Sequence, residues 1–235
     1  MVSASRLTNQ HIYDRIYAAI SERRLLPGTK LSEEKLATAF HASRTRVREV
    51  LLRLSQELII EVHPNRGAFV AKPTVGDVRQ VFAVRRALEP AIVTELAERR
   101  CLAAPDTALG LLREHLAAEA AARAQGNRLA LARLTGEFHV SLARATGNRL
   151  FTDSLRRLVA LTGLMIAQYA HPGGKSCPEH DHDDIVNAIE RGDAASARTL
   201  TLRHLGGIEA DLLPASLPAG EPDFAQIFGL DELSP

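Results

Sequence analysis

Three histidines in the second half of the chain lie where a helix would turn them toward an apolar core. His139 belongs to the stretch "LTGEFHVSLARATGN" at 134–148, and His182 and His204 belong to two later helical stretches. Residues three, four, seven or eight positions away share a helix face. The residues that share these faces are Leu131, Leu142 and Thr146 for His139, Ile185, Val186 and Ile189 for His182, and Ala197, Leu200, Ile208 and Leu212 for His204.

Three inward imidazoles on separate helices indicate a shared purpose. A single buried histidine is commonly a hydrogen-bonded core residue, but three would be costly to desolvate without a common partner. Neutral imidazole is a ligand for zinc, nickel and similar metals. Cys177 and His180 lack the second half of a four-ligand spacing, so we do not expect a structural zinc site there.

The elements that must position these histidines are all predicted to be helices. The segment 75–101 places Arg85 on its inward face, together with Val78, Val81, Phe82, Leu88, Ile92 and Leu96. Further helices are predicted at 106–125, 127–145, 148–170, 178–191 and 193–213, separated by Pro, Gly and Asn. The sequence therefore predicts an all-helical antiparallel bundle over 74–213, followed by a flexible tail at 214–235 with a short docked turn around 224–230.

The first 73 residues predict a different, smaller domain. A helix with Ile12, Ile16, Tyr17 and Ile20 on one face is followed by two short helices, which begin after Ser32 and Ser43 as N-caps. Val47, Val50, Leu51 and Leu54 form the buried face of the third helix. Two β-rich runs then flank the turn at 64–67. Short paired helices followed by a β-hairpin are the parts of a winged helix-turn-helix.

Charge is unevenly divided between the two parts. Residues 1–72 carry 12 Lys and Arg against 7 Asp and Glu, whereas 73–235 carry 17 against 21, although the whole chain is only +1. A basic first domain is expected where only that domain contacts a polyanion. Arginines at the start of the third helix can bond base edges or phosphates in the major groove, and Arg66 in the wing can reach the backbone or minor groove.

The overall composition excludes several classes of protein. With 46% hydrophobic and only 4% aromatic residues, the chain suits a helical core of aliphatic side chains rather than a β-sandwich. The apolar run at 158–170 is too short to span a membrane, and the N-terminus has no apolar signal segment. Cys101 and Cys177 give no disulfide framework. We therefore expect a cytoplasmic protein without membrane partners.

The N-terminal segment "LLPGTKLSEEKLATAFHASRTRVREVLLRLSQELI", with the later "RGAFV", resembles the DNA-binding domain of the GntR family of bacterial transcriptional regulators. This resemblance covers most of 10–73. It implies that Arg44, Thr45 and Arg48 read the operator and that Gly67 brings the wing tip close to DNA. The sequence departs from the family where Glu34 replaces a common arginine, Arg46 a common proline, and Leu58 a frequent glycine.

The segments "VFAVRRALEPAIVTELA", "EFHVSLARATGNRLF" and "HDDIVNAIERGDAASARTLTLRHL" are similar to the FCD effector-binding domain of the FadR subfamily of these regulators. Many members bind a metal through one aspartate and three histidines, and the histidines correspond to His139, His182 and His204. The aspartate position is Thr135 in this chain. Glu137 points to another helix face and is no replacement. The resemblance thus implies a divalent metal, zinc or nickel, on three histidines.

Three interpretations of this pocket remain open from the sequence. The first is a three-histidine metal with free positions for a carboxylate effector, the second is a metal-free anion pocket, and the third is a purely structural polar core. Arg85, at the matching family position, is predicted to contact the carboxylate, with an interhelical ion pair to a residue such as Glu137 as its alternative. Thr135 is expected beside the effector, and Asn148 either caps its helix or reaches the ligand.

The function predicted from these features is a ligand-responsive transcriptional repressor that is not an enzyme. We expect a homodimer that binds a palindromic double-stranded DNA operator, through residues including Arg44, Thr45, Arg46, Arg48, Arg66 and Gly67, and a small organic acid that alters this binding. The alternatives are a metal-dependent enzyme that uses the three histidines and a constitutive DNA-binding protein with an inert bundle. No inward carboxylate that could serve an enzyme as a general base is predicted near the histidines.

Overall fold

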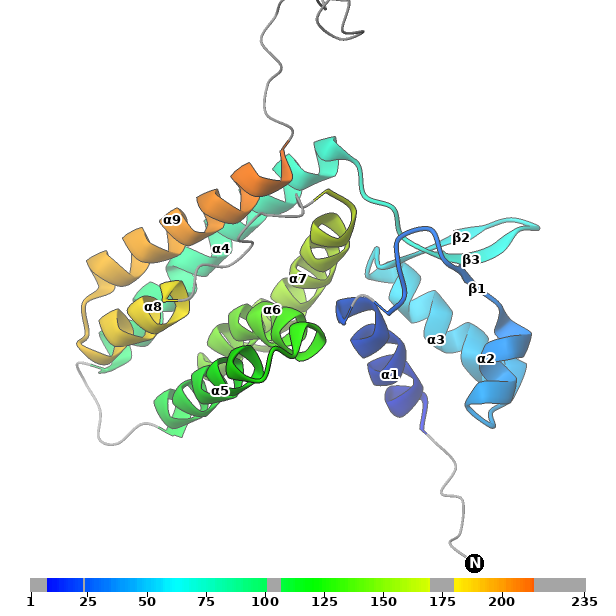
Figure 1. Cartoon of the computed structure of the whole chain (residues 1–235), viewed down its shortest axis with the longest axis horizontal. Helices are drawn as coiled ribbons and strands as arrows, with labels where there is room; N and C mark the ends of the chain where they lie inside the picture. The colour runs from blue at the N-terminus through cyan, green and yellow to red at the C-terminus, as the bar shows by residue number, and fades with distance from the viewer. Residues whose placement is uncertain (1–7, 23, 101–106, 170–179, 214–235) are drawn as a thin grey trace, which may run out of the picture.

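The computed structural model describes residues 8–22, 24–100, 107–169 and 180–213, which form two units side by side (Figure 1). The N-terminal unit contains α1 (Asn9–Ser21), β1 (Lys30–Leu31), α2 (Glu33–Ala39), α3 (Arg44–Gln56), β2 (Ile60–His63) and β3 (Gly67–Val70). The second unit contains α4 (Val75–Arg100), α5 (Thr107–Ala124), α6 (Arg128–Ala145), α7 (Arg149–Tyr169), α8 (Asp181–Glu190) and α9 (Ala194–Leu212). The predicted fold, a winged helix-turn-helix followed by a helical bundle, is confirmed.

The helices of the N-terminal unit begin where the sequence places hydroxyl caps. Thr8, Ser32 and Ser43 each accept a hydrogen bond from the backbone N–H three residues later. Such a cap satisfies one of the free donors in the first helical turn and contributes about 1 kcal/mol. The caps fix the starts of α1, α2 and α3, and the four predicted core residues of α3 are buried.

The wing is a three-stranded antiparallel sheet in the order β1-β3-β2. The predicted hairpin is β2 and β3, with Ile60 opposite Val70 and His63 opposite Gly67. The pairing of Lys30 and Leu31 with β3 was not predicted, because a two-residue strand has too little alternation to detect. This extra strand ties the turn before α2 to the wing.

The bundle follows the predicted helices closely. Asn127 and Asp193 cap α6 and α9, each through its side-chain oxygen. The helix predicted to start at 178 begins at Asp181 in the described residues. α4 packs along α9, α6 packs between α5 and α7, and α8 covers the end of α4 (Figure 1). The histidines lie inside this arrangement, on α6, α8 and α9.

The two units are joined by more than the chain that connects them. Ala160 and Leu164 of α7 belong to the same apolar cluster as the core of the N-terminal unit. The Tyr17 hydroxyl donates to the backbone oxygen of Arg156 on α7 at 3.0 Å. Tyr17 faces the bundle and is half-buried in the structure, whereas Tyr13 is fully buried in the same apolar cluster as Ile16.

Several expectations concern residues that the structure does not describe. The tail at 214–235, its turn around 224–230, and both cysteines lie outside the described residues. Within the described part, no helix is both long and apolar enough to cross a membrane.

Candidate functional site

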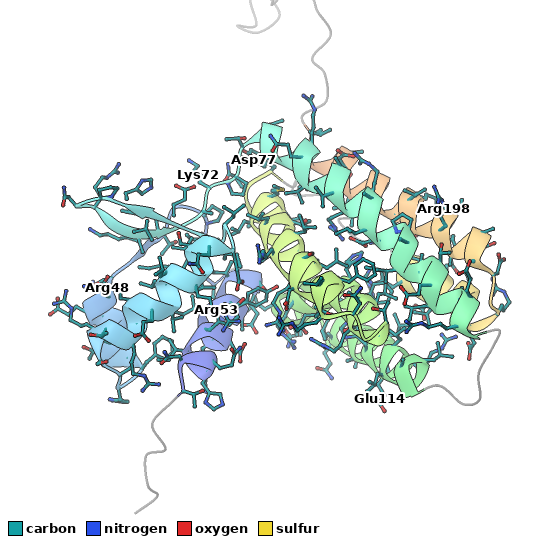
Figure 2. The ribbon with its side chains drawn as sticks, turned by 180° about the vertical axis from the view of Figure 1, so that it is seen from behind. Arg48, Arg53, Lys72, Asp77, Glu114 and Arg198 are labelled. Atoms are coloured by element: carbon teal, nitrogen blue, oxygen red, sulfur yellow. The ribbon has the colours of Figure 1, made fainter. Side chains whose placement is uncertain are left out.

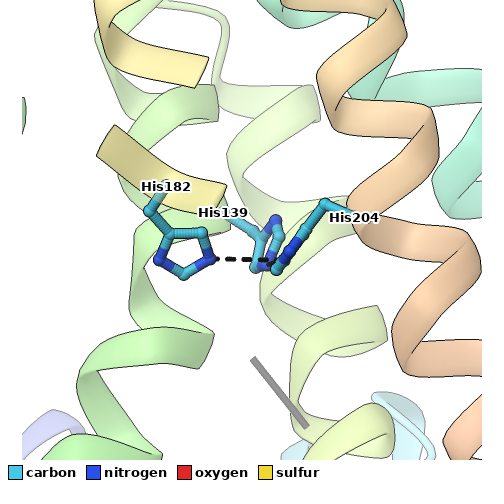
Figure 3. Close-up of side chains that lie close together, drawn as sticks. All are labelled: His139, His182 and His204. Carbon is cyan, nitrogen blue, oxygen red and sulfur yellow. Dashed lines mark hydrogen bonds between the residues drawn. The ribbon is translucent and has the colours of Figure 1, made fainter. Parts of the chain in front are cut away.

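Three imidazole rings from three helices meet inside the bundle (Figure 3). His139 comes from α6, His182 from α8 and His204 from α9, and all three are buried. The Nε2 atom of His204 lies 3.3 Å from that of His182 and 3.4 Å from that of His139. The convergence predicted from helical spacing is thus observed, and the three residues form a candidate metal-binding group.

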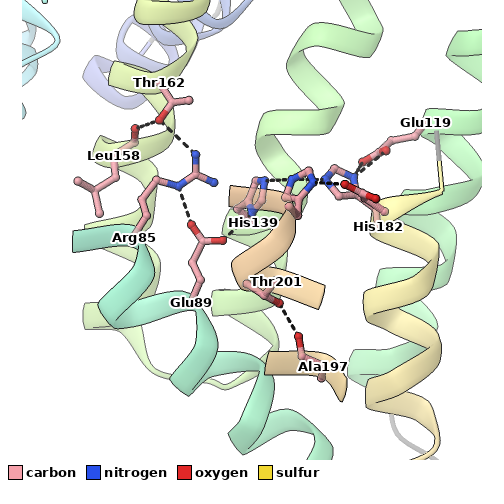
Figure 4. A network of polar contacts seen from close by, with 11 residues as sticks. Arg85, Glu89, Glu119, His139, Leu158, Thr162, His182, Ala197 and Thr201 are labelled. Carbon is pink, nitrogen blue, oxygen red and sulfur yellow. Dashed lines mark hydrogen bonds and ion pairs between the residues drawn. The ribbon is translucent and has the colours of Figure 1, made fainter. Parts of the chain in front are cut away.

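The other ring nitrogen of each histidine faces a carboxylate, and Figure 4 labels the pairs of His139 and His182. The pairs are His139 with Glu89 at 2.7 Å, His182 with Glu119 at 3.0 Å, and His204 with Asp181 at 3.0 Å, each through Nδ1. An ionised carboxylate only accepts hydrogen bonds, so each Nδ1 is the protonated nitrogen of its ring. In the neutral rings, the three Nε2 lone pairs therefore point toward one another.

These carboxylates correct the expectation that no inward acidic side chain lies near the histidines. Glu89 on α4 and Glu119 on α5 are buried, and Asp181 is the first residue of α8. Glu89 falls four residues after Arg85, on the same helix face, and this spacing was available in the sequence as a signal. Glu119 lies in an alanine-rich helix whose inward face is poorly marked by sequence.

Burial and the paired charges set the protonation of the cluster. Desolvation lowers the pKa of His139 to about 3, against the opposing effect of Glu89. Desolvation likewise lowers the pKa of His204. Burial raises the pKa of Glu119, but the bonds from His115 and His182 outweigh it and bring the value to about 2. His139 and His204 are therefore neutral imidazoles at pH 7, and Glu119 is an ionised carboxylate.

Arg85 lies beside this cluster and is almost completely buried. Its Nε donates to Glu89 at 2.6 Å and its Nη1 donates to Thr162 at 3.2 Å (Figure 4). The alternative considered from the sequence, an ion pair between Arg85 and Glu137, is wrong, because Glu137 accepts a hydrogen bond from Arg133 on its own helix. Arg85 Nη2 is buried without a hydrogen-bond partner in the described part of the chain.

A cavity opens beside the rings. Arg85, all three histidines and Thr135 line it, so the unpartnered guanidinium nitrogen belongs to a residue of its wall. A buried cationic donor without a partner is costly, and an anion in the cavity would supply one. Tyr17 and Ser21, from α1 of the N-terminal unit, also line the cavity.

The two remaining predicted ligand contacts differ in position. Thr135 borders the cavity, and its hydroxyl donates to the backbone oxygen of Leu131 at 3.0 Å. Asn148 is not among the residues that line the cavity. Its side-chain oxygen accepts from the backbone N–H of Leu150 at 3.0 Å, so it caps α7, the first of the two roles considered.

The residues present fit a divalent metal. Two nitrogens bound tetrahedrally to zinc at about 2.0–2.1 Å lie roughly 3.3 Å apart, close to the separations of His204 Nε2 from the other two Nε2 atoms. The candidate ligand atoms of the three histidines all lie within 4.8 Å of one another. Metal-bound histidines commonly donate their second N–H to a carboxylate, as all three rings do here. Phe138 stacks on the His182 ring at 3.9 Å between centroids and helps to hold it.

The N-terminal unit presents the predicted basic residues at the start of α3. Arg44, Thr45 and Arg48 are exposed, and Arg48 lies on the side of the unit away from the bundle (Figure 2). Arg48 makes two hydrogen bonds to Glu33 of α2, at 2.8 and 3.0 Å, which raise the pKa of Arg48. Arg46 donates to Asn9 at 2.8 Å. The outer face of α3 is therefore basic but partly tied to neighbouring polar groups.

The wing places its two predicted residues at the hairpin tip. Arg66 is exposed in the turn, with its guanidinium 5.8 Å from the Phe69 ring centroid. Gly67 has φ +94°, a conformation that a side chain would strain. A tip with no side chain at this position can approach another molecule closely.

Comparison with known families agrees with both units. The model for "Bacterial regulatory proteins, gntR family" matches residues 8–70, and the model for the FCD domain matches residues 80–207. This chain belongs to the GntR family and carries an FCD domain. Its winged helix-turn-helix is thus the DNA-binding part of a transcriptional regulator, and the histidine cluster lies in its FCD domain.

Curated GntR-family relatives cover most of the chain. It is 26% identical to the HTH-type transcriptional repressor RspR of Escherichia coli strain K12, over 84% of this chain and 85% of that protein. It is 26% identical to the HTH-type transcriptional regulator LutR of Bacillus subtilis strain 168, over 81% and 94%. A GntR regulator structure from Rhodococcus sp. RHA1 shares the fold, with TM-score 0.76, 23% identity, and coverage of 89% of this chain and 99% of that chain.

Proposed function

We propose that this chain is a transcriptional repressor whose DNA binding responds to a small carboxylate, held at a divalent metal on His139, His182 and His204. The observation that carries the proposal is the arrangement of three Nε2 atoms facing one another while each Nδ1 faces a carboxylate. Neutral rings turned this way repel through their lone pairs, and a cation between them removes the repulsion. The relative RspR is a transcriptional repressor, which supports the proposed direction of regulation.

The charges around the rings also favour a divalent cation. Each ring has a carboxylate at its Nδ1 atom, and of these Glu89 and Glu119 are buried and Asp181 is half-buried. Three neighbouring groups partly balance them: Arg85 bonds Glu89, His115 lies 3.3 Å from Glu119, and Arg203 lies 3.7 Å from Asp181. A carboxylate behind each ring makes its Nε2 atom a stronger donor to a cation. Nitrogen ligands alone suit zinc or nickel better than magnesium or calcium.

The carboxylate ligand is proposed from Arg85 and the cavity. The partnerless Arg85 Nη2 provides a buried charge-assisted donor for a carboxylate oxygen. When bound, a divalent metal with three protein ligands supplies open coordination positions for oxygen donors. Thr135 lines the same cavity without adding negative charge, so it leaves room for an anion. We therefore propose a small organic acid as effector and Arg85 and Thr135 as contacts.

DNA binding is proposed to involve two copies of the chain on a palindromic operator, as in other helix-turn-helix dimers. Arg44, Thr45, Arg46 and Arg48 lie at the start of α3, the end that commonly enters the major groove. Arg66 and Gly67 are proposed to bring the wing to the adjacent backbone. In this scheme, residues 1–73 bind DNA and residues 74–213 bind effector and form the dimer.

The test is operator release by a carboxylate in the presence of metal. An operator is first selected from random DNA with the full chain, and its binding is measured against a panel of small mono- and dicarboxylic acids, with added Zn²⁺ or with chelator. At least one acid should weaken operator binding in zinc only. His139→Ala should lose this response and keep operator affinity, and His11→Ala, an exposed histidine of α1, serves as control.

The outcomes separate the alternatives. An acid response that is equal with zinc and with chelator supports the metal-free anion pocket instead. If no acid in the panel affects DNA binding, the constitutive DNA-binding protein is favoured. Zinc-dependent chemical turnover of an acid would support the enzyme alternative.

A further inference from the structure

The cavity beside the histidines is completed by the DNA-binding unit. Tyr17 and Ser21 of α1 line it together with α6 and α7 residues of the bundle, among them Thr162 and Gly163. Tyr17 is held in place by its hydrogen bond to the Arg156 backbone and by the Arg156 guanidinium, 5.8 Å from its ring centroid. The cavity therefore has this wall only while α1 lies against the bundle.

The same residue of α1 is connected to the recognition helix α3. The Tyr17 ring stacks on Tyr13 with centroids 6.0 Å apart and an angle of 21° between the planes. The Tyr13 hydroxyl donates to Glu57 at 2.5 Å, and Glu57 is the C-cap residue of α3. The Arg53 guanidinium of α3 lies 4.0 Å from the centroid of the Tyr13 ring. A displacement of Tyr17 would therefore move Tyr13 and, through its contacts, α3.

The linker between the two units is bonded to the bundle at Pro73, independently of α1. The backbone oxygen of Pro73 accepts hydrogen bonds from the Tyr169 hydroxyl at 2.9 Å and from the Gln168 amide at 3.3 Å, both at the end of α7. The start of α4 is therefore fixed to the bundle. Among the described residues, α1 meets the bundle through the Tyr17 hydroxyl, through the apolar cluster that it shares with α7, and through Glu22, its C-cap residue, which pairs with Arg133 at 3.5 Å.

We propose that Tyr17 and Ser21 are ligand-contacting residues of the effector site, so that a molecule in the cavity displaces α1, and α3 with it, relative to the bundle. The proposal rests on the proposed function for the identity of the ligand, but the displacement itself depends only on filling the cavity. A ligand shifts the arrangement by its different contacts in the two positions of α1. The ligand then moves the winged unit by direct contact with α1 at the cavity wall, rather than through the linker between the units.

The test fills the cavity with a side chain instead of an unidentified ligand. Gly163 lines the cavity, and an added Cβ there meets nothing within 4 Å, so Gly163→Phe projects a ring into it. Gly206 in α9 also has open space around an added Cβ, but it is exposed and lies outside the cavity wall. Gly206→Phe is the matched control for the cost of a phenylalanine on a helix.

The readout is a distance between the units in the full chain. Spin labels are attached at Arg15→Cys on α1 and Arg149→Cys on α7, both exposed positions, with Cys101 and Cys177 changed to serine. Dilution with unlabelled chain removes distances between copies. Gly163→Phe should lengthen or broaden the distance distribution, and Gly206→Phe should leave it unchanged. An unchanged distribution in a folded Gly163→Phe chain would overturn the proposal.

Two further variants keep the test decisive. Tyr17→Ala removes the wall that the phenylalanine ring meets, so the change caused by Gly163→Phe should shrink in the double variant. An equal change with and without Tyr17 would assign the displacement to another contact and overturn the role of this residue. If Gly163→Phe fails to fold, Gly163→Leu provides the same comparison with a smaller side chain, and the same outcomes decide.

This experiment uses no metal, acid or DNA. A failed metal or carboxylate assignment therefore leaves the distance result intact, and a failed displacement leaves the metal result intact.

Discussion

The Nδ1 atom of His139 lies 2.7 Å from a carboxylate oxygen of Glu89, in a pair that is buried on both sides. Glu89 in turn accepts a hydrogen bond from Arg85. The pair fixes the ring so that its Nε2 faces the other two histidines. The orientation of this ring therefore depends on a residue fifty positions away in sequence.

Glu89→Gln should weaken metal binding by about 10- to 100-fold, the range found when outer partners of metal ligands are changed. The amide keeps the shape but removes the charge that makes His139 a stronger base. Zinc affinity is measured by competition with a chromophoric chelator. Glu137→Gln, which alters a carboxylate paired with Arg133 on the same helix as His139, should have little effect. Equal affinities of Glu89→Gln and wild type would contradict the role of Glu89.

The metal-free chain should lose stability on mild acidification. The pKa of His139 is lowered to about 3 by burial, whereas in the unfolded chain it returns to about 6.5. The unfolded state therefore binds more protons below pH 6.5, and the contribution of His139 is present above that pH and lost as pH falls toward 3. For this group alone, the free energy of unfolding should fall by roughly 1 kcal/mol between pH 7.5 and 5.5.

Chemical unfolding in chelator at the two pH values measures this loss. His139→Gln retains a hydrogen-bond donor for Glu89 but does not titrate, so its loss between the two pH values should be smaller. His63→Gln, which changes a partly exposed histidine of the wing, should behave like wild type. A pH dependence that is the same in all three proteins would remove His139 as its source.

Glu33→Gln should strengthen DNA binding, and Arg48→Ala should weaken it. Arg48 donates two hydrogen bonds to Glu33, and these must be broken before its guanidinium can form a bidentate contact with a base. The pair is exposed, so its energy is small and the gain should be less than about tenfold. Titration of a selected operator at fixed salt gives the affinities.

Glu34→Gln is the matched control for this comparison, because it removes the same charge from the same helix, whereas the carboxylate that Arg48 bonds is that of Glu33. If both glutamate variants bind DNA equally more tightly, the effect is long-range charge and not release of Arg48. Loss of Arg48 should cost about 1 to 3 kcal/mol and relax specificity at one position of each half-site if the contact is to a base.

Leu58→Gly should stabilise the protein by about 1 kcal/mol. Leu58 has φ +62° and an exposed side chain, so it carries the strain of the left-handed region without compensating burial. Glycine removes that strain. Leu52→Gly, at an exposed position inside α3, should instead destabilise by a similar amount. Thermal unfolding compares the two variants, and a destabilised Leu58→Gly protein would show that the leucine makes a contribution elsewhere.

The sequence predicted those parts of the fold that depend on local chemistry. Ser32 and Ser43 mark helix starts because a hydroxyl cap acts within one turn, and the turn at 64–67 marks the hairpin. The convergence of the histidines was predictable because helical period turns each one inward. β1 was missed because two residues carry no period.

The remainder of the site depends on packing between elements. Glu119 meets His182 across two helices, and no local pattern specifies that pairing. The position of Tyr17 at the cavity wall depends on how the two units dock, which a helical face alone does not determine. Arg85 was correctly placed inward, but its partner was not Glu137, since Glu89 lies one turn further along the same helix.

The metal content of the purified protein decides whether the three histidines hold one divalent metal. Full-length protein is stripped of metal with chelator, dialysed against excess Zn²⁺, and separated from unbound metal. Its zinc content is then measured by elemental mass spectrometry, together with that of the triple variant His139→Ala, His182→Ala, His204→Ala. We expect about one zinc per wild-type chain and almost none in the variant, with a higher melting temperature only for zinc-loaded wild type. Equal zinc content in the two proteins would contradict it.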